Sequence, residues 1–318
     1  MSIYQTDIAA GPLALPQPGF LSQRRVQTVA GLDAVFASAP RIAFDDSSRF
    51  VFLSDCHRGD NSRADAFSPN EELYLAALGR YRKRGFTYVE VGDGDDLWLN
   101  RRLESVRAAH PRVFDLLHDL DHDGRLHLIR GNHELDGRAA ATKDGLAVHE
   151  GLVLTHIHTN QRIFVVHGHQ VDPPCAALST VSRFMVTNFW AHVVRSPLGS
   201  HLRPTGTGQA PDGTLGTLIQ WLQMLRRGIA DRLAGWAQEQ RITTICAHTH
   251  RPVCANYGQA PYFNTGSCIA PGYITGIEIE RGVISLVKWS ASSLRAAGES
   301  LRIERQLLAA PRALCLFP

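Results

Sequence analysis

Five short motifs in this chain carry side chains of the types that bind metal ions, and an apolar run stands before each. Carboxylate, imidazole and amide oxygen ligands together suit Mn, Fe, Zn or Co, and no thiolate is present to select for zinc. The motifs are Asp55-Cys56-His57, Gly92-Asp93, Gly131-Asn132-His133-Glu134, His167-Gly168-His169 and Ala247-His248-Thr249-His250. The runs before them are Phe50–Leu53, Tyr88–Val91, Leu126–Ile129, Ile163–Val166 and Ile242–Cys246. One such motif occurs by chance in many proteins, but five in the same local setting indicate a metal cluster.

The apolar runs have the length and composition of buried β-strands. Ligand sites of open α/β folds form at the carboxyl ends of the strands, so we expect the five motifs to meet at one rim of a sheet. A helix is expected to begin at Ser68-Pro69-Asn70-Glu71, with Ser68 as N-cap and Glu71 completing a capping box. It ends at Gly85, and the next strand follows at once. This strand–helix–strand order continues to residue 133 and indicates βαβ units.

The end of the chain has a different pattern. Residues 261–289 predict a final β-meander of Tyr262-Phe263, Ile274–Ile279 and Val283–Val287. The fold class is therefore α/β, layered as a two-sheet β-sandwich flanked by helices. We expect an N-terminal arm and helix over residues 1–45, a main domain over 46–290 with a helical insertion at 170–241, and a C-terminal tail over 291–318.

The order of the motifs resembles the calcineurin-like metallophosphoesterase superfamily, whose pattern is D-x-H, GD-x-x-D, GNH-[ED], a lone His and GH-x-H. The resemblance covers roughly residues 49–290. Ala247 stands where the family usually has Gly. Three further segments resemble the UDP-2,3-diacylglucosamine pyrophosphohydrolase branch, although His133 occupies a position that is Arg in that branch. These segments are Leu97-Trp98, residues 248–252 and Asn264-Thr265-Gly266.

The resemblance implies two divalent metal ions, most simply Mn, about 3.5–4 Å apart. Asp93 takes the place of the carboxylate that bridges them, and a metal-bridging hydroxide would attack phosphorus in line. The ligands implied for one metal are Asp55, His57 and His250, and those for the other are Asn132, His167 and His248.

Four further residues are candidates for catalysis or substrate binding. His133 directly follows a ligand and could stabilise a phosphoryl oxygen or protonate the leaving group, an effect typically worth about 10²–10⁴-fold. Asp96 would orient His133 or another ligand. Arg58 is a candidate phosphate contact, since its guanidinium matches phosphate geometry; a salt bridge to Asp60 at the rim is the alternative. His169 could reach the substrate or lie at the surface.

Strand alternation predicts how the paired ligands point. Residues two apart on a strand point to the same side of the sheet. The side chains of Asp55 and His57 should therefore point the same way, and so should those of His248 and His250. Cys56 would then point away from the ligands, and we expect it to be buried by packing rather than to act as a nucleophile.

The insertion contains two apolar helical segments, Ala176–Val194 and Leu218–Trp236, on either side of a turn-rich stretch. They could pack on the core or form a homodimer interface. They could instead form a substrate-binding lid, which would also be compatible with peripheral membrane contact. The residues expected to line such a lid are Phe184, Met185, Phe189, Trp190, Trp221 and Leu225.

Bulk properties exclude several classes of protein. The net charge is only +3, and no stripe of aromatic and basic residues follows the chain, so no long nucleic acid is expected as a partner. The six cysteines lack C-x-x-C spacing, which argues against a disulfide framework. No signal peptide or long apolar stretch is visible, so a cytoplasmic location is expected.

These observations together predict a dinuclear metal-dependent phosphohydrolase that cleaves phosphodiester or pyrophosphate bonds. Its substrate would be a small-molecule phosphodiester, a nucleotide or a lipid-linked diphosphate. A phosphomonoesterase acting on a protein or small molecule is the first alternative. A non-catalytic metal-binding scaffold is the second, although no ligand position is lost.

Overall fold

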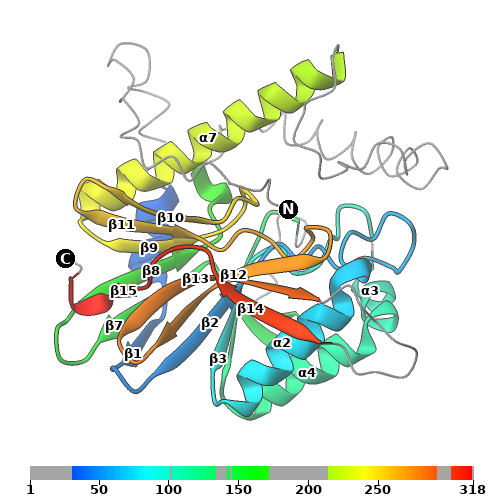
Figure 1. The fold of residues 1–318 in the computed structure, drawn as a ribbon, viewed down its shortest axis with the longest axis horizontal. Coiled ribbons are helices and arrows are strands. Elements are labelled where there is room, and N and C mark those ends of the chain that lie inside the picture. Colours follow the sequence, from blue (N-terminus) through cyan, green and yellow to red (C-terminus); the bar gives the residue numbers. More distant parts are fainter. Residues whose placement is uncertain are drawn as a thin grey trace.

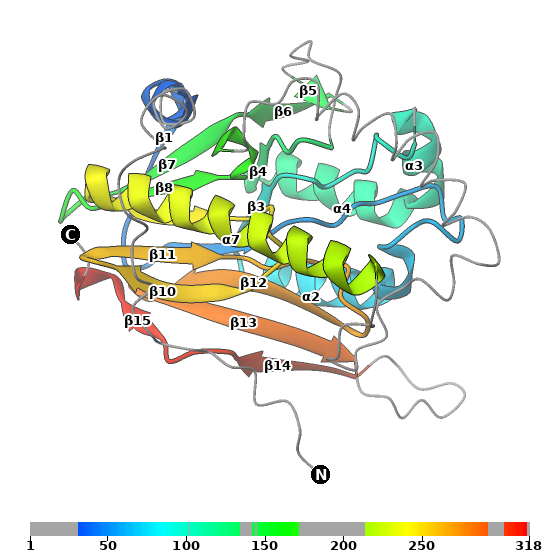
Figure 2. The ribbon, with the colours of Figure 1, turned by 90° about the horizontal axis from the view of Figure 1, so that it is seen from above.

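Two β-sheets pack face to face in the computed structural model of the chain, and helices cover their outer faces (Figures 1 and 2). The structure describes residues 31–100, 102–133, 142–143, 145–171, 214–291 and 302–316. The predicted α/β two-sheet sandwich flanked by helices is confirmed. None of the helices in the described part of the chain has the length and apolar character that crossing a membrane requires.

In the described part of the chain, the larger sheet has nine strands and is covered by α2 (Glu71–Lys83) and α4 (Pro111–His122), with α3 (Leu103–Ala109) beside α4. Along the sheet its strands are β14 (Ile303–Leu307), β13 (Val283–Ala291), β12 (Tyr273–Glu280), β2 (Arg49–Leu53), β3 (Thr87–Val91), β4 (Leu126–Ile129), β6 (Leu146–His149) and β5 (Thr142–Lys143), with β15 (Arg312–Ala313) beside β13. A 3-10 turn, η1 (Ser68–Asn70), leads into α2, and another, η5 (Leu314–Leu316), follows β15.

The smaller sheet has six strands and is covered by the long helix α7 (Thr214–Gln240) (Figure 2). Its strands run in the order β1 (Arg41–Phe44), β7 (Gly151–His156), β8 (Arg162–Val166), β9 (Thr243–Cys246), β11 (Ala260–Asn264) and β10 (Val253–Tyr257). The 3-10 turn η2 (His169–Val171) follows β8, and residues 31–38 form a helix before β1.

All five strands predicted before the metal-binding motifs are present, but they belong to both sheets. β2, β3 and β4 are parallel neighbours in the larger sheet, and β8 and β9 are parallel neighbours in the smaller one. We expected one rim of one sheet. The motifs instead meet where the carboxyl ends of two sheets lie together, so the site spans the sandwich.

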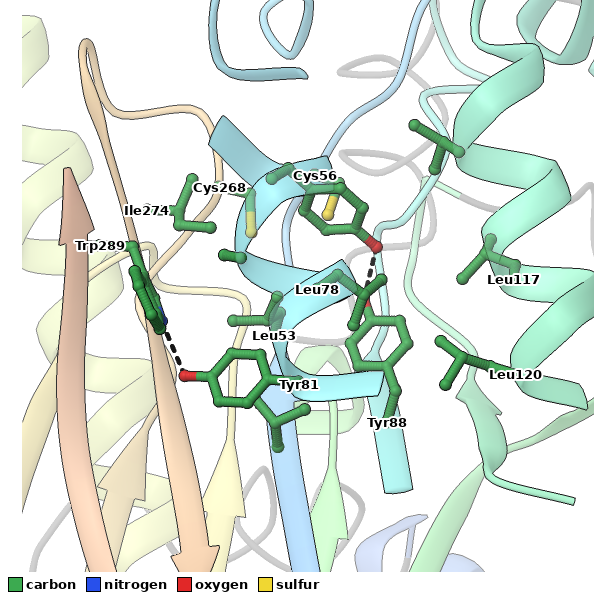
Figure 3. Packing of buried hydrophobic residues seen from close by; sticks show 14 of the residues in the cluster. Leu53, Cys56, Leu78, Tyr81, Tyr88, Leu117, Leu120, Cys268, Ile274 and Trp289 are labelled. Carbon is green, nitrogen blue, oxygen red and sulfur yellow. Dashed lines mark hydrogen bonds between the residues drawn. The ribbon is translucent and has the colours of Figure 1, made fainter. Parts of the chain in front are cut away.

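Buried clusters lie between the sheets and under each helical layer. The cluster between the sheets joins Phe52 and Val89 of the larger sheet to Ile245 of the smaller one. Under α2, the ring of Tyr81 packs against Trp289, whose indole N–H donates to the Tyr81 hydroxyl at 2.7 Å (Figure 3). Indole and phenol groups that pair in this way bury large apolar areas without leaving a polar atom unsatisfied.

Two local predictions need correction. Ser68 is not the N-cap of a helix, since the structure shows no side-chain cap at α2 and the Ser68 hydroxyl donates to Asn61 instead. The prediction of a final three-stranded meander is also wrong, because β11 pairs in parallel with β9 in the smaller sheet. Only β12 and β13 form the predicted hairpin, which turns at Arg281 and Gly282, both with positive φ.

The predicted helix at the end of the insertion is confirmed as part of α7. In its C-terminal half, Ile229, Leu233 and Trp236 are buried against the smaller sheet, as the packing alternative predicted for this half. The first helical segment of the insertion, with Phe184, Met185, Phe189 and Trp190, lies outside the described residues, as do the side chains of Trp221 and Leu225.

Candidate metal centre

Most of the predicted ligands sit in an unusual backbone conformation just beyond the strand ends. Non-glycine residues rarely adopt a positive φ, and such strain concentrates at functional sites. Nine non-glycine residues of the described chain do so. Five of the nine are predicted ligands, with φ between 47° and 68°: Asp55, His57, Asp93, His248 and His250.

The carboxylate of Asp55 is held so that one oxygen faces the site. Its Oδ2 accepts hydrogen bonds from the Ser54 hydroxyl at 2.5 Å and from the His248 N–H at 3.2 Å. Its Oδ1 is buried without a hydrogen bond of good geometry in the described structure, and lies 3.0 Å from Nε2 of His250. Burial raises the pKa of this carboxyl, but the charge and contact of His250 and the charge of His167 together outweigh burial and lower the pKa to about 2.

The carboxylate of Asp93, which follows β3 of the same sheet, is also held by a hydrogen bond to one of its two oxygens. Its Oδ1 accepts the His133 N–H at 2.9 Å. Its Oδ2 lies 3.8 Å from Nε2 of His57 and 3.3 Å from Nε2 of His167. One carboxylate oxygen therefore faces an imidazole from each of the two predicted ligand sets, as a bridging carboxylate must.

The ring of His167 is fixed by the backbone. Its Nδ1–H donates to the Val91 carbonyl at 2.8 Å, which turns Nε2 towards Asp93 and towards Oδ1 of Asn132 at 3.3 Å. Burial alone would lower the pKa of His167, but the charge and hydrogen bond of Asp93, the charge of Asp55 and the bond to Val91 together raise it to about 10. A divalent ion that binds Nε2 would replace this proton.

His57 is prepared as a neutral ligand. Burial and the neighbouring charge of His133 lower its pKa to about 4, so its ring is neutral near pH 7. Its Nε2 lies 3.2 Å from Nε2 of His250. Two imidazole nitrogens that approach so closely across the site gain from sharing one cation.

Two motif glycines are required by these side chains. A Cβ on Gly131 would lie 2.0 Å from Oδ1 of Asp93. A Cβ on Gly92 would lie 2.5 Å from Nδ1 of His167, and the φ of Gly92 is +80°. Both positions therefore admit only glycine while the carboxylate and the imidazole stay in place.

The donor atoms fit divalent metal ions. Three groups of side chains each place their donor atoms within 4.8 Å of one another. Ligands bound at about 2.0–2.2 Å in tetrahedral geometry are roughly 3–3.5 Å apart, close to the 3.0–3.8 Å separations found here. The groups are Asp55 with His57 and His250, His57 with Asp93 and His133, and Asp93 with His167 and His248.

His133 lies at the edge of the ligand cluster with its own support. Its Nδ1 contacts Oδ1 of Asp96 at 3.1 Å, and the indole of Trp98 stacks on its ring with centroids 4.1 Å apart. Burial lowers the pKa of His133, but Asp93 and Asp96 outweigh it and raise the pKa above its ordinary value. The geometry agrees with the role predicted for Asp96, which was to orient His133.

The predicted position of Arg58 needs correction. We expected it at the rim, in contact with phosphate or with Asp60, but its guanidinium is fully buried. It donates to Oδ1 of Asp95 at 2.6 Å and to both carboxylate oxygens of Glu90 at 2.7 and 2.8 Å. The side chain enters the interior because these buried carboxylates need a cation, so Arg58 is not a substrate contact.

The remaining candidates lie close to the site. His169 is half-buried, and its ring centroid is 5.5 Å from that of His167, but it belongs to none of the three donor groups. Cys56 is fully buried in the cluster under α2, as predicted (Figure 3).

Strand alternation does not explain how the ligands point. β9 ends at Cys246, before both His248 and His250, and the two rings join different donor groups. β2 likewise ends at Leu53, and the positive φ of Asp55 and His57 makes them converge. Strand alternation is therefore the wrong reason for the placement of these side chains, because neither pair lies on a strand.

Three supporting residues were not nominated from the sequence. Ser54 holds Asp55 and is itself 2.6 Å from the Thr265 hydroxyl, while Trp98 stacks on His133. Ser54 carried a signal, since a hydroxyl directly before a ligand can bond to it. Nothing in the sequence pattern links residue 265 to residue 54.

Comparison with known proteins gives a likeness in chain path. No protein-family model matches the chain, and neither does any curated protein. Solved structures with similar folds include YfcE, a phosphoesterase from E. coli, at 16% identity and a TM-score of 0.39, covering 84% of this chain and 99% of that one. A predicted phosphoesterase from Streptococcus pneumoniae has 14% identity and a TM-score of 0.34, covering 81% and 98%. Vps29 from Entamoeba histolytica, complexed with Zn²⁺, has 16% identity and a TM-score of 0.37, covering 81% and 98%.

The predicted family likeness is therefore judged on the residues of this chain. The order of its motifs and the convergence of its candidate ligands agree with what the predicted resemblance implies. The decisive observation is that Asp93 faces His57 on one side and His167 on the other. The likeness to the UDP-2,3-diacylglucosamine pyrophosphohydrolase branch stays a prediction.

Proposed function

We propose that the protein is a metal-dependent phosphohydrolase that cleaves phosphodiester or pyrophosphate bonds, in which Asp93 would help to hold both of two divalent ions. The observation that carries this proposal is the carboxylate of Asp93, whose Oδ1 is fixed by the His133 N–H while Oδ2 faces His57 and His167. When bound, two such ions supply charge neutralisation for the phosphoryl oxygens and a nucleophile at neutral pH.

The residues of this chain would hold the ions and the substrate in place. Asp55, His57 and His250 surround one position. Asp93, His167 and His248 surround the other, with the amide oxygen of Asn132 beside Nε2 of His167. Mn is the expected metal, with Fe, Zn and Co as alternatives, because the donors are imidazole nitrogens and oxygens.

His133 is the proposed proton donor to the leaving group. Its raised pKa keeps the ring protonated nearer neutrality, as a general acid requires. The contact of Nδ1 with Asp96 leaves Nε2 as the nitrogen that can reach a leaving oxygen. Trp98 covers one face of the ring and restricts its rotation.

The proposed substrates are small-molecule phosphodiesters, nucleotides or lipid-linked diphosphates. The side chains expected to line a lid that would select among them lie outside the described part of the chain. A lipid-linked substrate would require an apolar groove beside the metals, which mutation of Trp190 and Trp221 would probe through KM for acylated compared with unacylated diphosphates.

Hydrolysis of two model substrates tests the proposal. Metal-free protein restored with Mn²⁺ should hydrolyse bis(p-nitrophenyl) phosphate faster than p-nitrophenyl phosphate. Asp93→Asn should lower this rate by at least about 10²-fold, because a neutral amide cannot bridge two cations. Faster monoester hydrolysis would indicate a phosphomonoesterase. Bound metal without turnover of either substrate would favour a scaffold.

A further inference from the structure

A buried ion cluster is formed by residues next to the candidate metal ligands in the chain. It consists of Arg58, Glu90 and Asp95, whose exposed fractions are 0%, 1% and 0%. The guanidinium grips both oxygens of Glu90 and one oxygen of Asp95, at 2.6–2.8 Å. Charges buried this completely are costly unless they are paired in good geometry, as they are here.

The cluster connects two of the segments that carry ligands, those after β2 and β3. Arg58 directly follows His57, while Glu90 precedes Asp93 by three residues and Asp95 follows it by two. One side chain from the first segment therefore holds the second segment both before and after its bridging carboxylate. The backbones of the two segments are also hydrogen-bonded to each other, since the Arg58 N–H donates to the Gly94 carbonyl at 3.0 Å.

The packing of the cluster leaves no room for a side chain at position 94. A Cβ on Gly94 would lie 2.0 Å from Oε1 of Glu90 and 2.5 Å from Nη2 of Arg58. Glu90 is anchored from the other side by the Tyr88 hydroxyl, which donates to it at 3.1 Å. The cluster is thus fixed to the strand as well as to the loop.

We propose that Arg58 is a positioning residue that sets the separation of His57 and Asp93 through its bonds to Glu90 and Asp95, and thereby sets metal affinity. This inference rests on the proposed function. A buried ion pair is a poor source of stability compared with apolar packing, but it imposes one geometry. The bidentate fork of Arg is needed, since Lys keeps the charge and loses the geometry.

Arg58→Lys tests the inference, with Arg305→Lys as matched control. Arg305, on the edge strand β14, also donates to both oxygens of a buried carboxylate, that of Glu278. The readouts are Mn²⁺ titration by calorimetry, thermal unfolding of the metal-free proteins, and kcat and KM on bis(p-nitrophenyl) phosphate. Asp95→Asn, which keeps the pair of Arg58 with Glu90, serves if Arg58→Lys does not fold.

Arg58→Lys should weaken Mn²⁺ binding by about 10–100-fold, as loss of groups that orient ligands typically does. It should lower kcat and leave the substrate KM near the wild-type value, whereas a phosphate contact would raise KM. Asp95→Asn should shift affinity in the same direction. Arg305→Lys should change stability alone.

The inference is overturned if wild-type protein binds Mn²⁺ and turns over substrate while Arg58→Lys and Asp95→Asn bind the ion equally well. It is also overturned if Arg305→Lys weakens binding as much as Arg58→Lys does, because the effect would then follow from lost stability. Wild-type protein that binds no Mn²⁺ would remove the proposed function itself.

Discussion

The backbone N–H of His133 donates to Oδ1 of Asp93 at 2.9 Å. The proposed proton donor and the proposed bridging carboxylate are therefore held to each other across the ends of two neighbouring strands, β3 and β4. Because this bond occupies one oxygen, only Oδ2 remains to face the two ligand sets. A loop movement that displaced His133 would also release the bridge.

Replacing His133 by alanine should slow hydrolysis in a way that depends on the leaving group. General acids contribute about 10²–10⁴-fold when the leaving oxygen needs a proton, and p-nitrophenolate hardly needs one. A series of methyl phosphodiesters with leaving groups of rising pKa should show a growing deficit in His133→Ala. An equal loss across the series would mean that His133 stabilises the phosphoryl oxygen instead.

Gly131→Ala should abolish metal binding. Its Cβ would lie 2.0 Å from Oδ1 and 2.2 Å from the backbone nitrogen of Asp93, so Asp93 must move. The strain should also destabilise the fold by about 1–3 kcal/mol. Calorimetric Mn²⁺ titration and urea unfolding measure both effects.

Gly235→Ala is the control, since nothing lies within 4 Å of its added Cβ on α7. This variant should bind metal normally and gain about 0.5–1 kcal/mol from better helix propensity. Normal binding by Gly131→Ala would contradict the close approach in the site.

The buried pair of His110 and Asp65 should make stability depend on pH. Burial lowers the pKa of His110, but the hydrogen bond to Asp65 at 2.8 Å and the charge of Glu71 outweigh it and raise the pKa above 6.5. A raised pKa in the folded state adds stability that is complete below the unfolded pKa and is lost as pH rises through the folded value. The pKa of Asp65 is lowered despite burial, so its contribution disappears only in acid.

The urea midpoint of wild-type protein should therefore exceed that of His110→Gln by more at about pH 5.5 than at about pH 9. His122→Gln, at an exposed position on α4, should show no such trend. A difference between wild type and His110→Gln that stayed constant over this range would mean that His110 is neutral in the fold.

Cys56→Ala should retain activity within a few-fold, because the thiol is fully buried under α2 although its neighbours in sequence are ligands. Burial and the adjacent Cys268 raise the pKa of this thiol, so it is not a nucleophile near neutral pH. Stability should fall by about 1 kcal/mol for the small cavity. A loss of activity comparable with that of His133→Ala would contradict this account.

Local pattern was sufficient to predict the strands and the residues that converge. An apolar run that ends in a polar motif predicted β2, β3, β4, β8 and β9, and each carries its motif at its carboxyl end. Which strands pair with one another was less predictable. β11 joins β9 rather than β12 because strand pairing is decided by tertiary contacts, which the turn-rich segment after residue 264 does not reveal.

The directions in which the side chains point were also not predictable from the sequence. Positive φ at Asp55 and His57 breaks strand alternation, and Asp and His carry no sequence mark of it as glycine does. Arg58 was expected at the rim because it adjoins a ligand. Glu90 within the apolar run Tyr88–Val91 was the available signal, since a carboxylate in a buried strand needs a cationic partner.

The most direct test of the central claim is anomalous diffraction from a crystal of the protein soaked in Mn²⁺. The account predicts two manganese peaks about 3.5–4 Å apart, with the Asp93 carboxylate between them, Asp55, His57 and His250 around one, and His167 and His248 around the other. A single peak, or two peaks that do not share Asp93, would contradict it.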